Sequence, residues 1–216
     1  MIWNGVEKMN NRIPILNNHK KICIICEGDE EYDYIIRLSS LDVWDARYDI
    51  KAVNARGNGN IPARYQYCYQ AGAYDAIFVF CDTDMFPYNQ YGDIKQKIEL
   101  VHGTSKAVSQ TIIHANPCTM QIIILHWMDI TLKSHKKQDN ASIIKKCTGI
   151  VSYEAKTTQR KSLFSKINAS NYGVMKQHLS NKNKGDTVIG SSNFMTLVNN
   201  LENMNDDWIE ILNKAI

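Results

Sequence analysis

The sequence ICIICEG, residues 22–28, decides the fold of this 216-residue chain. Five apolar residues in a row are typical of a strand buried on both faces of a parallel sheet, and the acid and glycine mark its end. A second run of the same kind, AIFVFC at 76–81, leads directly into Asp82-Thr83-Asp84. We therefore expect two buried strands, each followed at once by carboxylates.

Helical and strand patterns alternate around these two runs. Apolar residues at helical spacing predict helices, and weaker β-type runs predict further strands. The predicted helices are 29–41, 62–71, 93–106 and 117–132, and the further strands are 48–53 and 111–114. Successive strand, helix and strand units imply right-handed crossovers. The expected fold class is α/β, a parallel four-stranded sheet with helices on both faces.

The last third of the chain has a different composition. After about residue 134 strand signals vanish, and short helical patterns follow at 139–147, 160–169, 172–180, 193–204 and 206–215. Between residues 129 and 190, twelve Lys or Arg face four Asp or Glu, a net charge of +8 that leaves −5 elsewhere. We expect an α/β domain at 1–134 and a basic helical extension packed on it at 135–216. Its charge fits a polyanionic partner or a solvated lysine-rich face.

Composition excludes several classes of protein. A chain that is 44% hydrophobic with a net charge of only +3 is not disordered as a whole, and its longest apolar stretch is too short to span a membrane. The first eight residues do not resemble a secretory leader, and the six cysteines lie mostly in apolar runs without zinc-ribbon spacing. We expect a cytoplasmic protein with reduced thiols, in which the Cys-x-x-Cys at 23–26 packs in the core.

Acidic side chains are expected to gather at one edge of the sheet. Glu27 ends one buried strand, and Asp82 and Asp84 end the other. The carboxyl ends of parallel strands share an edge, where like charges repel and a divalent cation relieves the repulsion. Oxygen ligands without histidine or cysteine favour Mg²⁺ or Mn²⁺, and such an ion can polarise a phosphate. In the alternative, Glu27 complements a helix dipole and Asp82 is a turn residue.

Several short motifs occur in the order found in one known family. They are Glu27-Gly28, Gly57-Asn58-Gly59, Tyr74-Asp75, Asp82-Thr83-Asp84, Asn116-Pro117-Cys118 leading to Leu125-His126, and Tyr153-x-x-Lys156. Together they resemble the TOPRIM fold of topoisomerases, primases and OLD-type nucleases, and in particular its RloB-like branch. The resemblance covers roughly residues 20–160. It implies a TOPRIM-like sheet and a metal-dependent nuclease associated with bacterial defence against phage.

The resemblance also assigns roles to residues. It implies that Glu27 is a general acid/base or a metal ligand and that Asp82 and Asp84 bind Mg²⁺. This chain departs from the pattern twice. Thr119-Met120 stands where the branch has Phe-Glu, and Asp29-Glu30-Glu31 stands where it has Lys-Thr-Glu. These departures leave open an alternative function, a catalytically impaired module that binds nucleic acid or a partner protein.

The remaining candidates concern substrate and partners. His126 either orients a water or a phosphate, or is a buried histidine with satisfied hydrogen bonds. Lys156, Arg160 and Lys161 either contact nucleic acid or form a solvated face. The expected substrate is RNA, such as tRNA, or DNA. An ATPase or sensor protein is an expected partner, and a homodimer is a further expectation. No association with a membrane is expected. A weaker alternative interprets Asp82-x-Asp84 as the motif of a haloacid-dehalogenase-like phosphatase.

Overall fold

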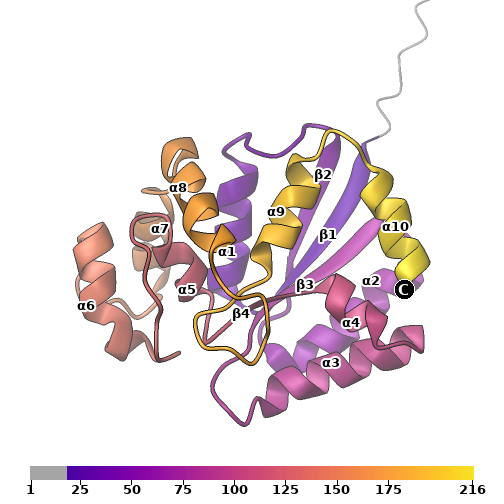
Figure 1. Cartoon of the computed structure of the whole chain (residues 1–216), viewed down its shortest axis with the longest axis horizontal. Helices are drawn as coiled ribbons and strands as arrows, with labels where there is room; N and C mark the ends of the chain where they lie inside the picture. The colour runs from indigo at the N-terminus through magenta and orange to yellow at the C-terminus, as the bar shows by residue number, and fades with distance from the viewer. Residues whose placement is uncertain (1–18) are drawn as a thin grey trace, which may run out of the picture.

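The computed structural model describes residues 19–216 and has a four-stranded, all-parallel sheet, as Figure 1 shows. Its strands are β1 (Lys20–Cys26), β2 (Tyr48–Asn54), β3 (Ala76–Asp82) and β4 (Ile112–Ala115), in the order β2-β1-β3-β4. The expected fold class, an α/β sheet with a helical C-terminal region, is confirmed. The expectation about a secretory leader concerns residues that lie outside the described ones.

Strand β1 is buried on both faces, which explains its uninterrupted apolar sequence. Ile24 and Cys26 belong to the hydrophobic cluster on one face of the sheet, and Cys23 and Ile25 belong to the cluster on the other. Successive residues of a strand point to opposite faces, so the two cysteines are separated by the sheet. Both are free thiols, and the prediction that they pack in the core is confirmed.

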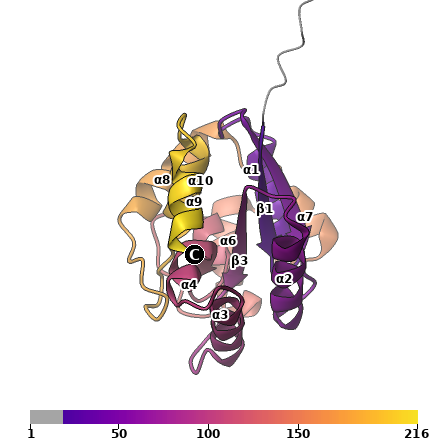
Figure 2. The ribbon, with the colours of Figure 1, turned by 90° about the vertical axis from the view of Figure 1, so that its right-hand side faces the viewer.

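Helices cover both faces of the sheet. One face carries α1 (Asp29–Ser39), and the other carries α2 (Ile61–Ala71), α3 (Asn89–His102) and the short α4 (Lys106–Thr111). Figure 2 shows α2 on one side of β1 and β3 and α9 on the other. The helix predicted at 93–106 corresponds to α3, which begins and ends four residues earlier, and α4 begins at the last residue of the predicted range.

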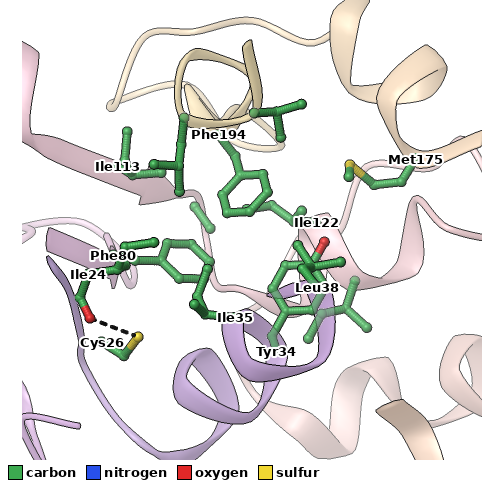
Figure 3. Close-up of a cluster of buried hydrophobic side chains, with 14 of the residues drawn as sticks. Ile24, Cys26, Tyr34, Ile35, Leu38, Phe80, Ile113, Ile122, Met175 and Phe194 are labelled. Atoms are coloured by element: carbon green, nitrogen blue, oxygen red, sulfur yellow. Dashed lines mark hydrogen bonds between the residues drawn. The ribbon is translucent and has the colours of Figure 1, made fainter. Parts of the chain in front are cut away.

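The C-terminal helices pack on the same face as α1. They are α6 (Lys137–Thr148), α7 (Thr157–Phe164), α8 (Ala169–Ser180), α9 (Phe194–Glu202) and α10 (Asp207–Ala215). Figure 3 shows Phe194 and Met175, from α9 and α8, in one cluster with Tyr34 of α1 and Phe80 of β3. The helical extension therefore shares the core of the sheet. Within residues 19–216, no helix is long and apolar enough to cross a membrane.

The prediction of one long helix at 117–132 is wrong. The structure has only α5 (Met120–Ile124), and the chain then turns away into a loop. The side chain of Gln121 holds this loop, because its Nε2 donates to the carbonyl of Ile130 at 2.8 Å and its Oε1 accepts from the N–H of Leu132 at 2.7 Å. A buried side chain that satisfies loop backbone groups replaces the hydrogen bonds of a continued helix.

Candidate active site

The functional candidates lie where the strand order reverses. From β1 the chain continues to β2 on one side, whereas β3 continues to β4 on the other, so the β1/β3 junction is a topological switch point. In open parallel sheets, ligands bind in the crevice outside the carboxyl ends of the strands at such a point. Glu27 directly follows β1 and Asp82 is the last residue of β3, so both acids lie there.

Backbone pairing continues past β1 and fixes the position of Glu27. The N–H of Glu27 donates to the carbonyl of Phe80 at 3.0 Å, and Glu27 Oε2 accepts from the N–H of Asp82 at 2.9 Å. The Glu27 carboxyl therefore lies across the end of β3. The strand-end arrangement expected for these two acids is formed.

Asp82 is anchored by a residue that sequence reasoning treated only as a departure from the family pattern. Asp82 Oδ1 accepts from the N–H of Thr119 at 2.6 Å and from its hydroxyl at 2.7 Å. Thr119 is fully buried and precedes the first residue of α5. A threonine just before an apolar helical run is a common helix-start signal, but it does not reveal which carboxylate the residue contacts.

A fourth acid, Glu31, joins the cluster. Its Oε2 accepts from the N–H of Gly28 at 3.0 Å, which closes the first turn of α1, and the residue is only 5% exposed. In the sequence, Glu31 is an acid three residues after Gly28, the residue that caps the start of α1. Such a pattern predicts a helix start and does not distinguish a solvated acid from a buried one, so this residue was missed as part of the site.

Burial and mutual repulsion make these carboxyls weak acids. Burial, followed by the charge of Glu31, raises the pKa of Glu27 to about 8. Burial and the charge of Glu30 raise the pKa of Glu31 to about 7. Burial, with the charges of Glu31 and Glu27, also raises the pKa of Asp82 well above its usual range. Carboxyls at a shared edge thus retain protons near neutral pH unless a cation compensates them.

The expected three-carboxylate metal site is formed only in part. The charge of Asp84 contributes to the raised pKa of Glu27, and Asp84 itself has left-handed backbone geometry with φ 56°. Residues 19–216 nevertheless contain no group of three or more His, Cys, Asp or Glu side chains arranged to hold an ion. The donors have the chemistry that Mg²⁺ or Mn²⁺ prefers, and Glu27 contacts the backbone of Asp82, but the three acids do not form a complete ion site within residues 19–216.

The helical extension reaches this edge through Glu30. The hydroxyl of Tyr153 donates to Glu30 Oε1, and Lys137 Nζ lies 3.6 Å from Glu30 Oε2. Tyr153 is buried, whereas the side chain of Lys137 is 41% exposed. The basic extension therefore places one lysine beside the acidic edge of the sheet.

His126 lies in the core. It is 1% exposed, and its ring nitrogens contact the hydroxyl of Tyr34 at 2.9 Å and Asn171 Oδ1 at 3.2 Å. Burial lowers the pKa of His126 to about 4. Of the two alternatives for this residue, the structure supports the satisfied buried histidine between α1 and α8, and the catalytic assignment is not supported.

The three predicted nucleic-acid contacts lie in different environments. Arg160 is buried; its Nε donates to Asp33 at 2.7 Å and its Nη2 lies 3.0 Å from Asp29, so its charge is already balanced. It is better described as a link between α7 and α1. Lys156, which precedes α7, pairs at the surface with Glu154, and Lys161 is exposed. These two lysines remain candidates.

Replacing Arg160 by methionine should therefore destabilise the protein. Arg160→Met removes the pairing with Asp29 and Asp33, and we expect a loss of about 2 kcal/mol in the free energy of unfolding, because a charged hydrogen-bonded group is lost. The matched variant Lys161→Met should change stability by less than about 0.5 kcal/mol. Urea unfolding measures both; equal stability of the two variants would contradict the structural role of Arg160.

Comparison with protein-family models, with curated proteins and with solved structures gives no match. The interpretation of this site therefore depends on its own geometry and electrostatics. Two adjacent carboxyls with raised pKa values, at the switch point of a parallel sheet, are the features that a functional hypothesis must explain.

Proposed function

We propose that this protein is a metal-dependent nuclease that hydrolyses phosphodiester bonds of RNA or DNA. The observation that carries the proposal is the contact between the carboxyl of Glu27 and the end of β3 at Asp82, in the crevice where an open parallel sheet binds its ligand. Clusters of buried titratable groups with strongly shifted pKa values are typical of catalytic sites. The resemblance to the RloB-like TOPRIM branch supports a role as an effector of bacterial defence against phage.

The side chains of this chain suit acid–base chemistry on a phosphate. Glu27 can act in one of two ways: with its metal-free pKa of about 8 it retains a proton near neutral pH and can give it to a leaving oxygen, or it loses that proton to bind a divalent ion. Thr119 fixes one oxygen of Asp82, and no described residue donates a hydrogen bond to the other. Glu27 and Asp82 would hold a divalent ion, which supplies charge stabilisation at a phosphate oxygen when bound.

The charge distribution supports a polyanionic substrate. The net charge of +8 lies between residues 129 and 190, a segment that includes α6, α7, α8 and the loops that join them, and Lys156 and Lys161 of this segment are exposed. Exposed lysines attract a phosphate backbone at long range without reading its sequence. An ATPase or sensor partner and a homodimer remain part of the proposal.

Cleavage assays test this function. We expect degradation of labelled tRNA, single-stranded RNA or DNA with Mg²⁺ or Mn²⁺, and none with chelator. Cleavage that continues unchanged in chelator, or the absence of cleavage of every substrate with either metal, would contradict the proposal.

A second function, a binding module without catalysis, is favoured by one observation. Met120 is buried beside Asp82 at the position where the resembling branch has a glutamate, and the acids do not form a complete ion site within residues 19–216. This alternative predicts nucleic-acid binding that weakens steeply with salt, without cleavage in either metal.

A further inference from the structure

A small cavity joins the acidic edge to the helical extension. Its volume is about 20 Å³, enough for one water-sized group, and it opens beside Asp82. Two of its lining residues, Glu30 of α1 and Met120 of α5, belong to the α/β part of the chain. His135 and Lys137 line it from just before and at the start of α6. The cavity therefore brings acids from one half of the sequence next to basic and polar groups from the other half.

The ammonium group of Lys137 is close to this edge but makes no hydrogen bond to it. Its Nζ lies 3.6 Å from Glu30 Oε2, which is too long for a hydrogen bond, and no other described residue accepts a hydrogen bond from it. Glu30 already accepts a hydrogen bond from the hydroxyl of Tyr153. Lys137 thus keeps all its N–H donors for a further acceptor, while its charge stays near Asp82.

A second feature of this cavity is a buried polar atom of His135. Its Nδ1 is buried and makes no hydrogen bond within residues 19–216, although the residue lines the same cavity as Lys137. Buried polar atoms in proteins almost always have a partner, and a cavity of this size holds one water that can pair with His135 Nδ1.

The charges of the site require a local cation. When they are ionised, the carboxyls of Glu27, Glu31 and Asp82 repel an approaching phosphodiester, and this repulsion is strong where water is partly excluded. Among the residues that line the cavity, Lys137 is the only lysine or arginine. A lysine ammonium is a common point-charge partner of phosphate.

We infer that Lys137 contacts a phosphate group of the nucleic acid at the mouth of this cavity, outside the space beside the buried Nδ1 of His135. The inference rests on the proposed nuclease function and adds to it a group that holds the substrate. The cavity admits only a water-sized group, so the phosphate lies outside it and directs an oxygen toward Lys137. In this arrangement the carboxylate of Glu30 forms an ion pair with Lys137 in the free protein and competes with the substrate phosphate for its charge.

Acylation of lysines shows directly whether Lys137 meets the substrate. The wild-type protein is treated with an amine-acylating reagent, with and without a single-stranded RNA or DNA oligonucleotide, in Ca²⁺ and in chelator, and modified peptides are quantified by mass spectrometry. We expect bound oligonucleotide to slow acylation of Lys137, and to leave Lys145 and Lys146, exposed in the last turn of α6, unchanged. Equal protection of all three, or none at Lys137 while the oligonucleotide binds, overturns the inference.

Variants separate a substrate contact from a structural ion pair. Lys137→Met should weaken oligonucleotide binding about 10-fold, Lys137→Arg should stay within about threefold of wild type, and the control Lys146→Met should not change it. Glu30→Gln should strengthen binding up to about threefold, because it removes the competitor. A purely structural pair predicts that Glu30→Gln and Lys137→Met weaken binding alike, and that result overturns the inference.

The inference and the proposed function fail in different ways. Metal-dependent cleavage that persists at the wild-type rate and KM in Lys137→Met, with no protection of Lys137, refutes the inference and leaves the nuclease intact. Protection of Lys137 without cleavage in any metal refutes the nuclease and supports the contact in a binding module. Absence of both binding and cleavage refutes both.

Discussion

Glu27→Gln should reduce metal-dependent cleavage at least about 100-fold without unfolding the protein. The amide keeps the size of the side chain, and its carbonyl oxygen can still accept the hydrogen bond from the N–H of Asp82. It cannot give or take a proton near neutral pH, and it is a much weaker ligand for Mg²⁺. Initial cleavage rates at saturating metal measure this change, and circular dichroism confirms the fold.

A matched variant controls for loss of charge alone. Glu99→Gln alters an exposed acid on α3, away from the carboxyl edge of β1, and should leave cleavage within about twofold of wild type. Asp82→Asn should behave like Glu27→Gln, because both carboxyls belong to one cluster. Near wild-type cleavage in both edge variants would refute the assigned site.

Without a divalent ion, the protein should lose stability as the pH rises from 6.5 to 8. The pKa of Glu27 is raised to about 8 and that of Glu31 to about 7, so the folded protein still binds protons that the unfolded chain has released. Stability falls with pH wherever the folded state holds more protons. We expect a loss of about 2 kcal/mol over this window, or roughly 4–8 °C in Tm.

The window keeps small an opposing effect of two histidines. Burial lowers the pKa of His114 and of His126 to about 4, so both stabilise the folded protein increasingly as pH rises to about 6.5, where the unfolded chain loses its histidine protons. Above pH 6.5 these two histidines together add only about 0.8 kcal/mol, so thermal melts in chelator between pH 6.5 and 8 report mainly the carboxyls. Glu27→Gln should flatten this slope, and excess Mn²⁺ at pH 8 should restore Tm. A wild-type Tm that rises across the window would contradict the electrostatics of the cluster.

The fold was predictable because its main signals are local. Uninterrupted apolar runs at 22–26 and 76–81 identify strands buried on both faces, and the parallel topology then places Glu27 and Asp82 at one edge without any knowledge of side-chain contacts. The edge acids could therefore be predicted from sequence order alone.

Other parts of the site depend on tertiary packing. Lys137 reaches Glu30 from more than one hundred positions away, and Thr119 contacts Asp82 through a turn whose geometry no spacing encodes. His126 fits a sequence pattern but is buried by α1 and α8. The apolar run after residue 117 suits a helix and a buried loop equally well, and the hydrogen bonds of Gln121 decide between them.

A crystal structure of the protein soaked in Mn²⁺ tests the central claim most directly, that the β1/β3 edge is a divalent-metal site. The anomalous signal of manganese identifies the ion independently of water. We expect one manganese peak at this edge, with oxygens of Glu27 and Asp82 about 2.0 to 2.2 Å from it. This peak should be absent from a crystal of Glu27→Gln. An edge without a manganese peak at saturating Mn²⁺, with Glu27 and Asp82 placed as in the metal-free protein, would contradict it.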